Sequence, residues 1–331
     1  MSLREESTSS EGAAAAMSDA TLLRWELARR SAVAWREAWE ACGAFEWVAF
    51  AYLGISGALI ALFHRNLPSA AFHLSFRAGL LALILILAWT AERRPARAAR
   101  FARHWYPQLF FLGCFEELQS IAHLIFPGWF DRKLIAFDHR LTGVNPTVWL
   151  QQFARPWLND FMQMGYLTYF FYLIVLGALL YRRGEWRSFW TLMTASIAAY
   201  SMGYLIAVLF PIESPFHSLR ALHTVELRGG FFTALVGVIE RFGRVHGGAF
   251  PSEHVAGSFV VLLGAWRYRR WLFWIFLPFF ACMLVATVYG RYHYIADVLA
   301  GLLTGAMGWW MGAKLMRLRR ACPPERMQKT S

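Results

Sequence analysis

Eight apolar runs constrain the fold of this chain more than any other feature of its sequence. They cover roughly residues 46–64, 71–91, 105–126, 161–181, 188–210, 252–266, 271–289 and 293–316. Runs of about 18 mostly apolar residues are typical of membrane-spanning helices. With 57% apolar and only 16% charged residues, the chain is also too apolar for a water-soluble globule. The sequence therefore predicts an all-α, polytopic transmembrane helical bundle of about eight helices.

The basic residues predict how this bundle is oriented. If the N-terminus is cytoplasmic, every short basic cluster falls on the cytoplasmic side: residues 24–36, 93–103, 182–187, 267–270 and 314–320. This matches the positive-inside rule, so we expect a multi-pass protein of the cell membrane with both termini in the cytoplasm. These clusters and their attraction to anionic lipids account for most of the net charge of +12. No nucleic-acid partner is therefore expected.

Two histidines stand where apolar runs begin. His254 follows Pro251 and Ser252 at the start of the sixth run, and His293 opens the eighth. A hairpin of adjacent helices brings its two ends to one membrane face, which is here the extracytoplasmic one. The stretch 251–266 would rise only about 24 Å at 1.5 Å per residue, whereas a hydrocarbon core is about 30 Å thick. We therefore expect a site recessed below the outer surface.

These histidines, together with an aspartate, can perform phosphoryl transfer without a metal. Neutral imidazole is a good nucleophile toward phosphorus, and Asp297, four residues after His293, could hold the other ring nitrogen from the same helical face. His254 could then protonate the departing oxygen as a general acid. No metal or other cofactor is implied, and the four cysteines form no CxxC pair.

Four further residues are candidates for substrate binding. Ser252 lies at a helix start, where free backbone N–H groups bind phosphate oxygens. Arg291 could donate paired hydrogen bonds to the same oxygens. His217 and Arg220 lie in the loop 211–250, whose basic character suits an anionic substrate.

The two motifs resemble those of the type 2 phosphatidic acid phosphatase superfamily, in which the second motif reads Pro-Ser-x-His and the third ends His-x-x-x-Asp. The resemblance implies a six-helix catalytic membrane domain over residues 105–316 and a phosphorylated intermediate at His293. It also implies that Asp297 orients that ring, that His254 is the general acid and that Ser252 binds phosphate. The remaining segments would be a disordered tail (1–20, with Met17 a candidate for the true start), an amphipathic segment with two transmembrane helices (21–104) and a basic cytoplasmic tail (317–331).

Two departures separate the chain from the phosphatases of that superfamily. The Lys-x6-Arg-Pro motif is missing, because Arg155 and Pro156 have no lysine at the required distance, and Thr287 stands where the third motif has an arginine. Both departures resemble the inositol phosphorylceramide synthase branch, as do looser matches at 137–143 and 210–215. The resemblance favours transfer of an inositol-phosphate-type head group from a phospholipid or sphingolipid to a lipid alcohol. A lipid phosphate phosphatase acting on phosphatidic acid or polyprenyl phosphate, a proton-coupled transporter and an inactive scaffold are the alternatives, and the oligomeric state is left open.

Two polar segments call for a structural interpretation. Glu116 and Glu117 interrupt the third apolar run, and we interpret them as a polar contact inside the bundle. Residues 129–160 interleave aromatic and charged side chains and are too polar to span a membrane. We expect one or two interfacial amphipathic helices there.

Overall fold

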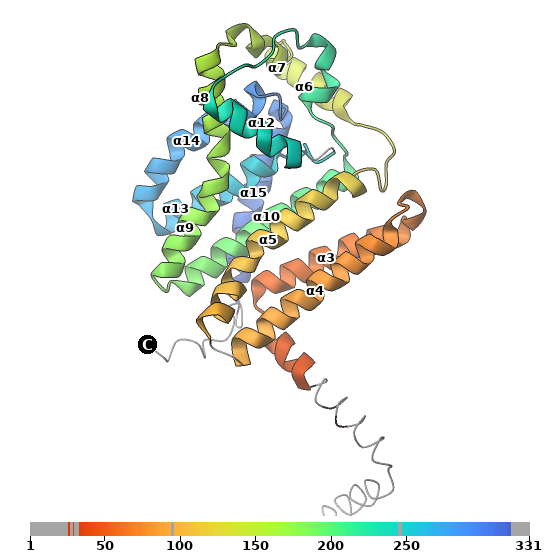
Figure 1. Ribbon diagram of the computed structural model, residues 1–331, viewed down its shortest axis with the longest axis vertical. Coiled ribbons are helices and arrows are strands. Elements are labelled where there is room, and N and C mark those ends of the chain that lie inside the picture. The colour runs from red at the N-terminus through yellow and green to blue at the C-terminus, as the bar shows by residue number, and fades with distance from the viewer. Residues whose placement is uncertain (1–25, 27–28, 30–32, 94–95, 244–246, 319–331) are drawn as a thin grey trace, which may run out of the picture.

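The protein is a bundle of α-helices. A computed structural model describes residues 26, 29, 33–93, 96–243 and 247–318, and within these residues it contains the α-helices α3 to α15 and no β-strand (Figure 1). The predicted all-α polytopic bundle is therefore confirmed. The predicted disordered tail 1–20, the candidate start Met17 and residues 319–331 of the predicted basic tail lie outside the described residues.

All eight apolar runs form helices. They are α3 (Ala44–Leu62), α4 (Ala70–Arg93), α5 (Arg97–Ile121), α8 (Pro156–Leu167) continued by α9 (Tyr169–Arg182), α10 (Trp186–Leu209), α13 (Glu253–Tyr268), α14 (Arg270–Tyr289) and α15 (Ile295–Leu315). Six of these, with α8 and α9 taken together, are long and apolar enough to cross a membrane. Outside this set are α5, which carries several charged residues, and α13, which has only 16 residues. The chain is a membrane protein.

Short helices form the connections at one end of the bundle. They are α6 (Asp131–Thr142), α7 (Pro146–Leu150), α11 (Pro215–Ser218) and α12 (Phe231–Gly243), of which α6 and α7 lie at the top of Figure 1 and α12 packs beside α8. Helices α6 and α7 occupy the segment 129–160, where interfacial helices were expected. Together these connections surround the start of α13 and of α15.

Glycines let α15 pack closely against two neighbouring helices. They recur at three- and four-residue intervals at positions 301, 305, 308 and 312. A Cβ at Gly301 would lie 2.6 Å from the carbonyl oxygen of Ser252 in front of α13, and one at Gly312 would lie 2.5 Å from the backbone of Ala195 in α10. Small residues in such series allow close backbone approach between membrane helices. The position of α15 relative to α13 is thus fixed by backbone contact.

Buried ion pairs join the first two helices to α5. Glu117 accepts hydrogen bonds from Arg77 Nη1 at 2.5 Å and His73 Nδ1 at 2.7 Å, and all three side chains are buried. Nearer the other end of α5, Arg103 pairs with Glu46 of α3 at 3.0 Å. The interpretation of Glu117 as a polar contact inside the bundle is confirmed. The adjacent Glu116 is only half-buried.

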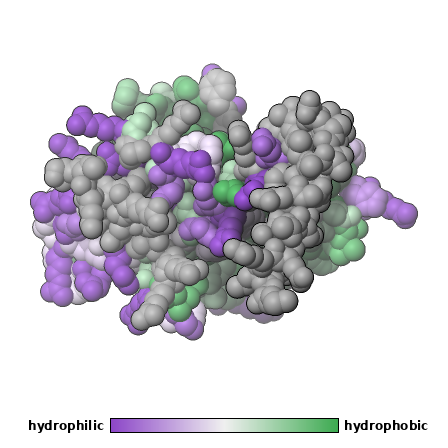
Figure 2. Space-filling view, turned by 90° about the horizontal axis from the view of Figure 1, so that it is seen from below, coloured by the Kyte–Doolittle hydropathy of each residue, from purple (hydrophilic) through white to green (hydrophobic). Residues whose placement is uncertain are grey.

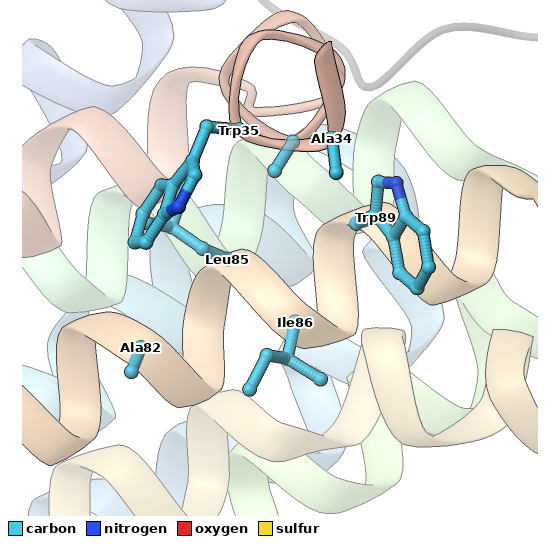
Figure 3. Close-up of a pocket in the computed structure, with 7 residues that line it drawn as sticks. Ala34, Trp35, Ala82, Leu85, Ile86 and Trp89 are labelled. Carbon is cyan, nitrogen blue, oxygen red and sulfur yellow. The ribbon is translucent and has the colours of Figure 1, made fainter. Parts of the chain in front are cut away.

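The residues before α3 also pack on the bundle. Residues 33–40 are helical, and an apolar groove of about 280 Å³ lies between them and α4, lined by residues that include Trp35, Leu85 and Trp89 (Figure 3). An ion pair between Glu37 and Arg93 also joins residues 33–40 to α4. The view of the molecule from below shows hydrophilic side chains gathered at this end (Figure 2).

The Glu117 cluster leads to a prediction about stability. We expect Glu117→Ala to lower the free energy of unfolding by about 3–5 kcal/mol, because it leaves the charge of Arg77 buried without its partner. Thermal unfolding of the purified protein in detergent would measure the loss. Glu116→Ala is the matched control, for which we expect little change. Equal melting temperatures for the two variants would contradict the assigned role.

Candidate active site

A polar cavity of about 100 Å³ lies where the short connecting helices meet the bundle. Its wall combines acidic, aromatic and imidazole side chains from α5, α8, α9, α12 and α13, from α11 and the residues before it, and from the segment before α15. The lining residues are Phe115, Tyr166, Tyr169, Glu213, Ser214, Phe216, His217, Ile239, Glu240, Gly248, Ala249, Glu253, His254, Tyr292 and His293. Both histidines of the two sequence motifs therefore face one cavity.

The two motif histidines are in direct contact. His254 belongs to the first turn of α13, and its Nδ1 lies 3.1 Å from Nε2 of His293. The other nitrogen of His254, Nε2, lies 2.9 Å from the hydroxyl of Tyr166 on α8. The pairing of the two histidines, expected from the helical hairpin, is present in the structure.

The surroundings of His293 determine which of its nitrogens carries the proton. Its Nδ1 lies 2.9 Å from the carbonyl oxygen of Ala249 and 3.4 Å from Oδ2 of Asp297. A carbonyl can only accept a hydrogen bond, so Nδ1 must be the donor. The lone pair of the neutral ring is then on Nε2, the atom that points to His254. This is the tautomer that a nucleophilic imidazole requires.

Asp297 reaches His293 by a different route from the one expected. His293 precedes α15, which begins at Ile295, so the two side chains do not share a helical face. Instead Asp297 lies in the first turn, where its Oδ2 also accepts a hydrogen bond from the backbone N–H of Tyr294 at 2.8 Å. The expectation of a shared helical face was wrong, because the chain enters the helix only after the histidine. The carboxylate both caps the helix and contacts the ring.

The same reasoning fixes the tautomer of His254. Since Nε2 of His293 is an acceptor, Nδ1 of His254 donates to it, and Nε2 of His254 accepts from the Tyr166 hydroxyl. The proton of His254 therefore lies on the side that faces His293. With both imidazoles neutral, a single chain of hydrogen bonds runs from Tyr166 through both rings to the carbonyl oxygen of Ala249.

The contact between the rings also implies a movement when a substrate binds. Reacting atoms stand about 3–3.5 Å apart before attack, and a general acid contacts the leaving oxygen at about 2.7–3 Å. Ring nitrogens 3.1 Å apart leave no room for a phosphoryl group between them. The two rings must separate to admit a phosphorus atom in line with both.

Ser252 is buried at the start of α13 and lies outside the cavity lining. Its hydroxyl accepts a hydrogen bond from the N–H of Val255 at 3.4 Å, and its own N–H donates to the carbonyl oxygen of Asp297 at 3.0 Å. In the structure this residue is therefore an N-cap, which links the start of α13 to the first turn of α15.

The three remaining candidates differ in their access to the cavity. His217 lines it, whereas Arg220 is exposed in the turn that follows α11. Arg291 is buried beside the cavity with φ of 66°, and its guanidinium donates a hydrogen bond to the carbonyl oxygen of Val225. Burial lowers the pKa of Arg291, and burial followed by the charge of Arg291 lowers the pKa of the neighbouring His223 to about 4. Only His217 of the three lines the cavity itself.

Asp138 of α6 positions the start of α15, a role that sequence reasoning missed. Its two carboxylate oxygens accept hydrogen bonds from the backbone N–H groups of Ile295 at 2.8 Å and Ala296 at 3.0 Å. Burial raises the pKa of Asp138, and the two N–H groups oppose that rise. Helix N-termini attract carboxylates. The acidic side chain within the expected interfacial helix was therefore the sequence feature from which this role could have been predicted.

Asp131, the first residue of α6, supports the cavity wall. It accepts hydrogen bonds from the N–H of Glu213 at 2.9 Å, the N–H of Ser214 at 3.3 Å and the hydroxyl of Tyr294 at 2.8 Å. Ser214 has φ of 121°, a conformation that non-glycine residues rarely adopt without support. Asp131 therefore ties the wall that contains Glu213 to the segment that carries His293.

Glu253 is a second residue that the sequence did not single out. It precedes His254, lines the cavity and is only 7% exposed, and neither carboxylate oxygen has a hydrogen-bond partner in the described part of the chain. Gly203 of α10 leaves room for it, since a Cβ at that position would lie 1.5 Å from Oε1. An unpaired carboxyl group at such a position is costly and calls for an explanation.

Comparison with known proteins identifies a family. A family model described as the PAP2 superfamily matches residues 132–311, which is more than half of the chain and lies within the expected catalytic domain 105–316. The match runs from α6 to α15 and so includes both histidines and Asp297. No curated protein and no solved structure matched the chain.

The hydrogen-bond chain leads to a prediction about Tyr166. We expect Tyr166→Phe to lower the turnover number about three- to tenfold, because it removes one hydrogen bond that orients His254. Steady-state kinetics on a phosphoester substrate would measure the change. Tyr172→Phe is a matched control, since that hydroxyl contacts Thr168 away from the cavity. A turnover number unchanged in Tyr166→Phe would show that this hydrogen bond does not orient the ring during reaction.

Proposed function

The chain belongs to the PAP2 superfamily, and from this premise we propose that it is a membrane-embedded phosphotransferase that acts on lipid phosphoesters through a phosphohistidine intermediate. The observation that carries the proposal is the contact of 3.1 Å between Nδ1 of His254 and Nε2 of His293 inside the cavity. It provides a nucleophilic lone pair and a proton donor at one place.

In the first step, Nε2 of His293 attacks phosphorus. The bond from phosphorus to nitrogen forms and the bond from phosphorus to the leaving oxygen breaks. His254, protonated on both ring nitrogens when the anionic substrate is bound, passes its Nδ1 proton to that oxygen and becomes neutral. The ring of His293 becomes positively charged, and Asp297, 3.4 Å from Nδ1, stabilises that charge. The first N–H groups of α13 have no partners within the helix and are suited to bind the phosphoryl oxygens.

In the second step, an acceptor hydroxyl replaces His293 on phosphorus. His254, now lacking its Nδ1 proton, accepts the proton of that hydroxyl, and the bond from phosphorus to nitrogen breaks. We propose that the acceptor is a lipid alcohol and that the donor is a phospholipid or sphingolipid, so that a phosphorylated head group is transferred. With water as the acceptor, the same intermediate would make the protein a lipid phosphatase.

A more specific part of this proposal is the identity of the transferred head group. An inositol-phosphate-type head group is suggested by the resemblance at 137–143 and 210–215. In the first of these segments Asp138 contacts the start of α15, and in the second Glu213 and Ser214 line the cavity. Asp138 contributes to the position of the site rather than to recognition of a head group, so the resemblance at 137–143 has little weight in choosing it.

We also propose an orientation for the protein in the cell membrane. With both termini cytoplasmic, the cavity faces the extracytoplasmic side, as the distribution of basic residues between the helices favours. Lipids of the outer leaflet would then reach the histidines directly.

Product analysis tests the proposed reaction. Purified protein would be given phosphatidylinositol, phosphatidylcholine, phosphatidylethanolamine and phosphatidic acid, each with and without ceramide or diacylglycerol, and the lipids analysed by mass spectrometry. We expect a new phospholipid to form only when an acceptor is present, and none to form with His293→Ala, because that variant lacks the nucleophile.

Two other outcomes would redirect the proposal. Free phosphate formed regardless of acceptor would make the protein a phosphatase with the same intermediate. Identical lipids from the wild type and His293→Ala would remove the phosphotransferase proposal altogether. Size-exclusion elution of the variant would confirm that it remains folded.

Cysteine labelling tests the proposed orientation. In a background without native cysteines, Ala221→Cys places a thiol on the exposed turn after α11, and Arg183→Cys places one in the exposed turn between α9 and α10. We expect a membrane-impermeant maleimide to label the first in intact cells and the second only after permeabilisation, because the two turns lie on opposite sides of the membrane. The reverse pattern would invert the orientation.

A further inference from the structure

The charge of the cavity lining is unusual for a site that handles phosphate. Three carboxylates line it, from Glu213, Glu240 and Glu253, and no lysine or arginine is among the lining residues in the described part of the chain. Glu213 and Glu240 take part in other interactions, so their charges are partly engaged. Glu253 is left as the lining carboxyl group without such an interaction in the described part of the chain.

The side chain of Glu253 lies in the cavity wall without a hydrogen-bond partner among the described residues. It is 7% exposed and both its oxygens lack a hydrogen-bond partner among the described residues. The glycine at position 203 leaves the space that its carboxyl group occupies. Because a buried carboxylate without a partner is strongly disfavoured, a cationic group in the cavity would relieve a large desolvation penalty.

Aromatic rings also line the cavity that contains this carboxyl group. Five of them line the cavity, from Phe115, Tyr166, Tyr169, Phe216 and Tyr292. The rings of Tyr166 and Tyr292 are stacked, with centroids 4.5 Å apart, and the ring of Tyr169 meets His254 edge-on at 4.4 Å. Aromatic faces attract alkylammonium groups, and cages of aromatic rings are a known arrangement for binding them.

We propose that this cavity binds the ammonium end of a zwitterionic phospholipid head group, phosphocholine or phosphoethanolamine, with Glu253 as its counter-ion. This rests on the proposed phosphotransferase function and names its donor class. The phosphate of the head group reaches the histidine pair while the ammonium group lies against Glu253 and the tyrosines. One cavity thus accommodates both charges of the head group.

The other candidate head groups fit this lining less well. A phosphomonoester such as phosphatidic acid carries about −1.5 to −2 charges near neutral pH, which no lysine or arginine among the described lining residues neutralises. An inositol ring offers hydroxyl groups and no positive charge to compensate Glu253. The cavity, about 100 Å³ in volume, is also smaller than the pockets of about 300–1,000 Å³ that enclose drug-sized ligands. A short ammonium-bearing head group suits that volume best.

Donor competition on the wild-type protein tests the proposal first. Phosphatidylcholine, phosphatidylethanolamine, phosphatidylinositol and phosphatidic acid would be mixed at equal mole fractions with diacylglycerol or ceramide in detergent micelles, and the consumption of each followed by mass spectrometry. We expect the two zwitterionic donors to be consumed at least about tenfold faster than the other two, because only they supply a partner for the buried carboxylate.

Glu253→Gln removes the charge and keeps the shape. We expect it to lower the preference for zwitterionic donors over phosphatidylinositol at least about tenfold, measured as a ratio of kcat/KM values. Glu226→Gln is the matched control, since Glu226 is exposed, lies outside the cavity lining and pairs with the exposed Arg228. We expect that control to keep the wild-type preference.

A comparison of two soluble inhibitors covers the case in which Glu253→Gln does not fold. Phosphocholine and its carbon isostere, in which a tert-butyl group replaces the trimethylammonium group, would be tested against the wild-type protein. We expect phosphocholine to inhibit at least about tenfold more strongly, because the isostere has the same shape without the charge. Equal inhibition by the two would contradict an ammonium site.

The outcomes separate this inference from the function on which it rests. If the wild type consumes phosphatidylinositol or phosphatidic acid with no preference for zwitterionic donors, and His293→Ala does not, the ammonium site is wrong and the phosphotransferase stands. If no lipid distinguishes the wild type from His293→Ala, both proposals fall. A preference that survives in Glu253→Gln would remove Glu253 from recognition.

Discussion

The hydrogen bond between the rings of His254 and His293 is the contact on which the rest of the site depends. Inside a membrane bundle every ring nitrogen needs a partner, because water does not compensate a lost hydrogen bond there. The carbonyl of Ala249 can only accept, so it sets the direction of the whole chain back to Tyr166. With both rings neutral, this backbone carbonyl leaves the lone pair of His293 on Nε2 and directs the Nδ1 proton of His254 toward it.

Holding two rings in such a contact requires the starts of two helices to be fixed relative to each other. The backbone does this directly, because the N–H of Ser252 donates to the carbonyl of Asp297, and Gly301 brings α15 against the same residue. Asp138 then fixes the start of α15 from outside the bundle. A displacement of about 1 Å can reduce a catalytic rate a hundredfold, which explains why this junction is held by backbone contacts and a buried carboxylate.

The sequence predicted the bundle and the meeting of His254 with His293 because both follow from the lengths and order of apolar runs. It could not predict the direction of each side chain. Arg291 resembled a phosphate ligand in sequence, but the backbone at φ of 66° turns its guanidinium to a loop carbonyl. Tyr166 and Glu253 went unnoticed since one is an aromatic residue in an apolar run and the other a polar residue at a helix start. Their significance comes from partners that are distant in sequence, or from the lack of a partner.

The missing Lys-x6-Arg-Pro motif and the buried carboxyl group of Glu253 have a common physical explanation on the proposed function. A phosphomonoester dianion needs several cationic donors around its oxygens, which is a role for paired lysine and arginine side chains. A phosphodiester carries a single negative charge, which helix N–H groups and the histidines can accommodate. If the donor also carries an ammonium group, its head group is neutral as a whole, and a carboxylate becomes a favourable neighbour. On the proposed function, the absence of the cationic motif and the presence of the Glu253 carboxyl group both suit a zwitterionic diester better than a phosphomonoester.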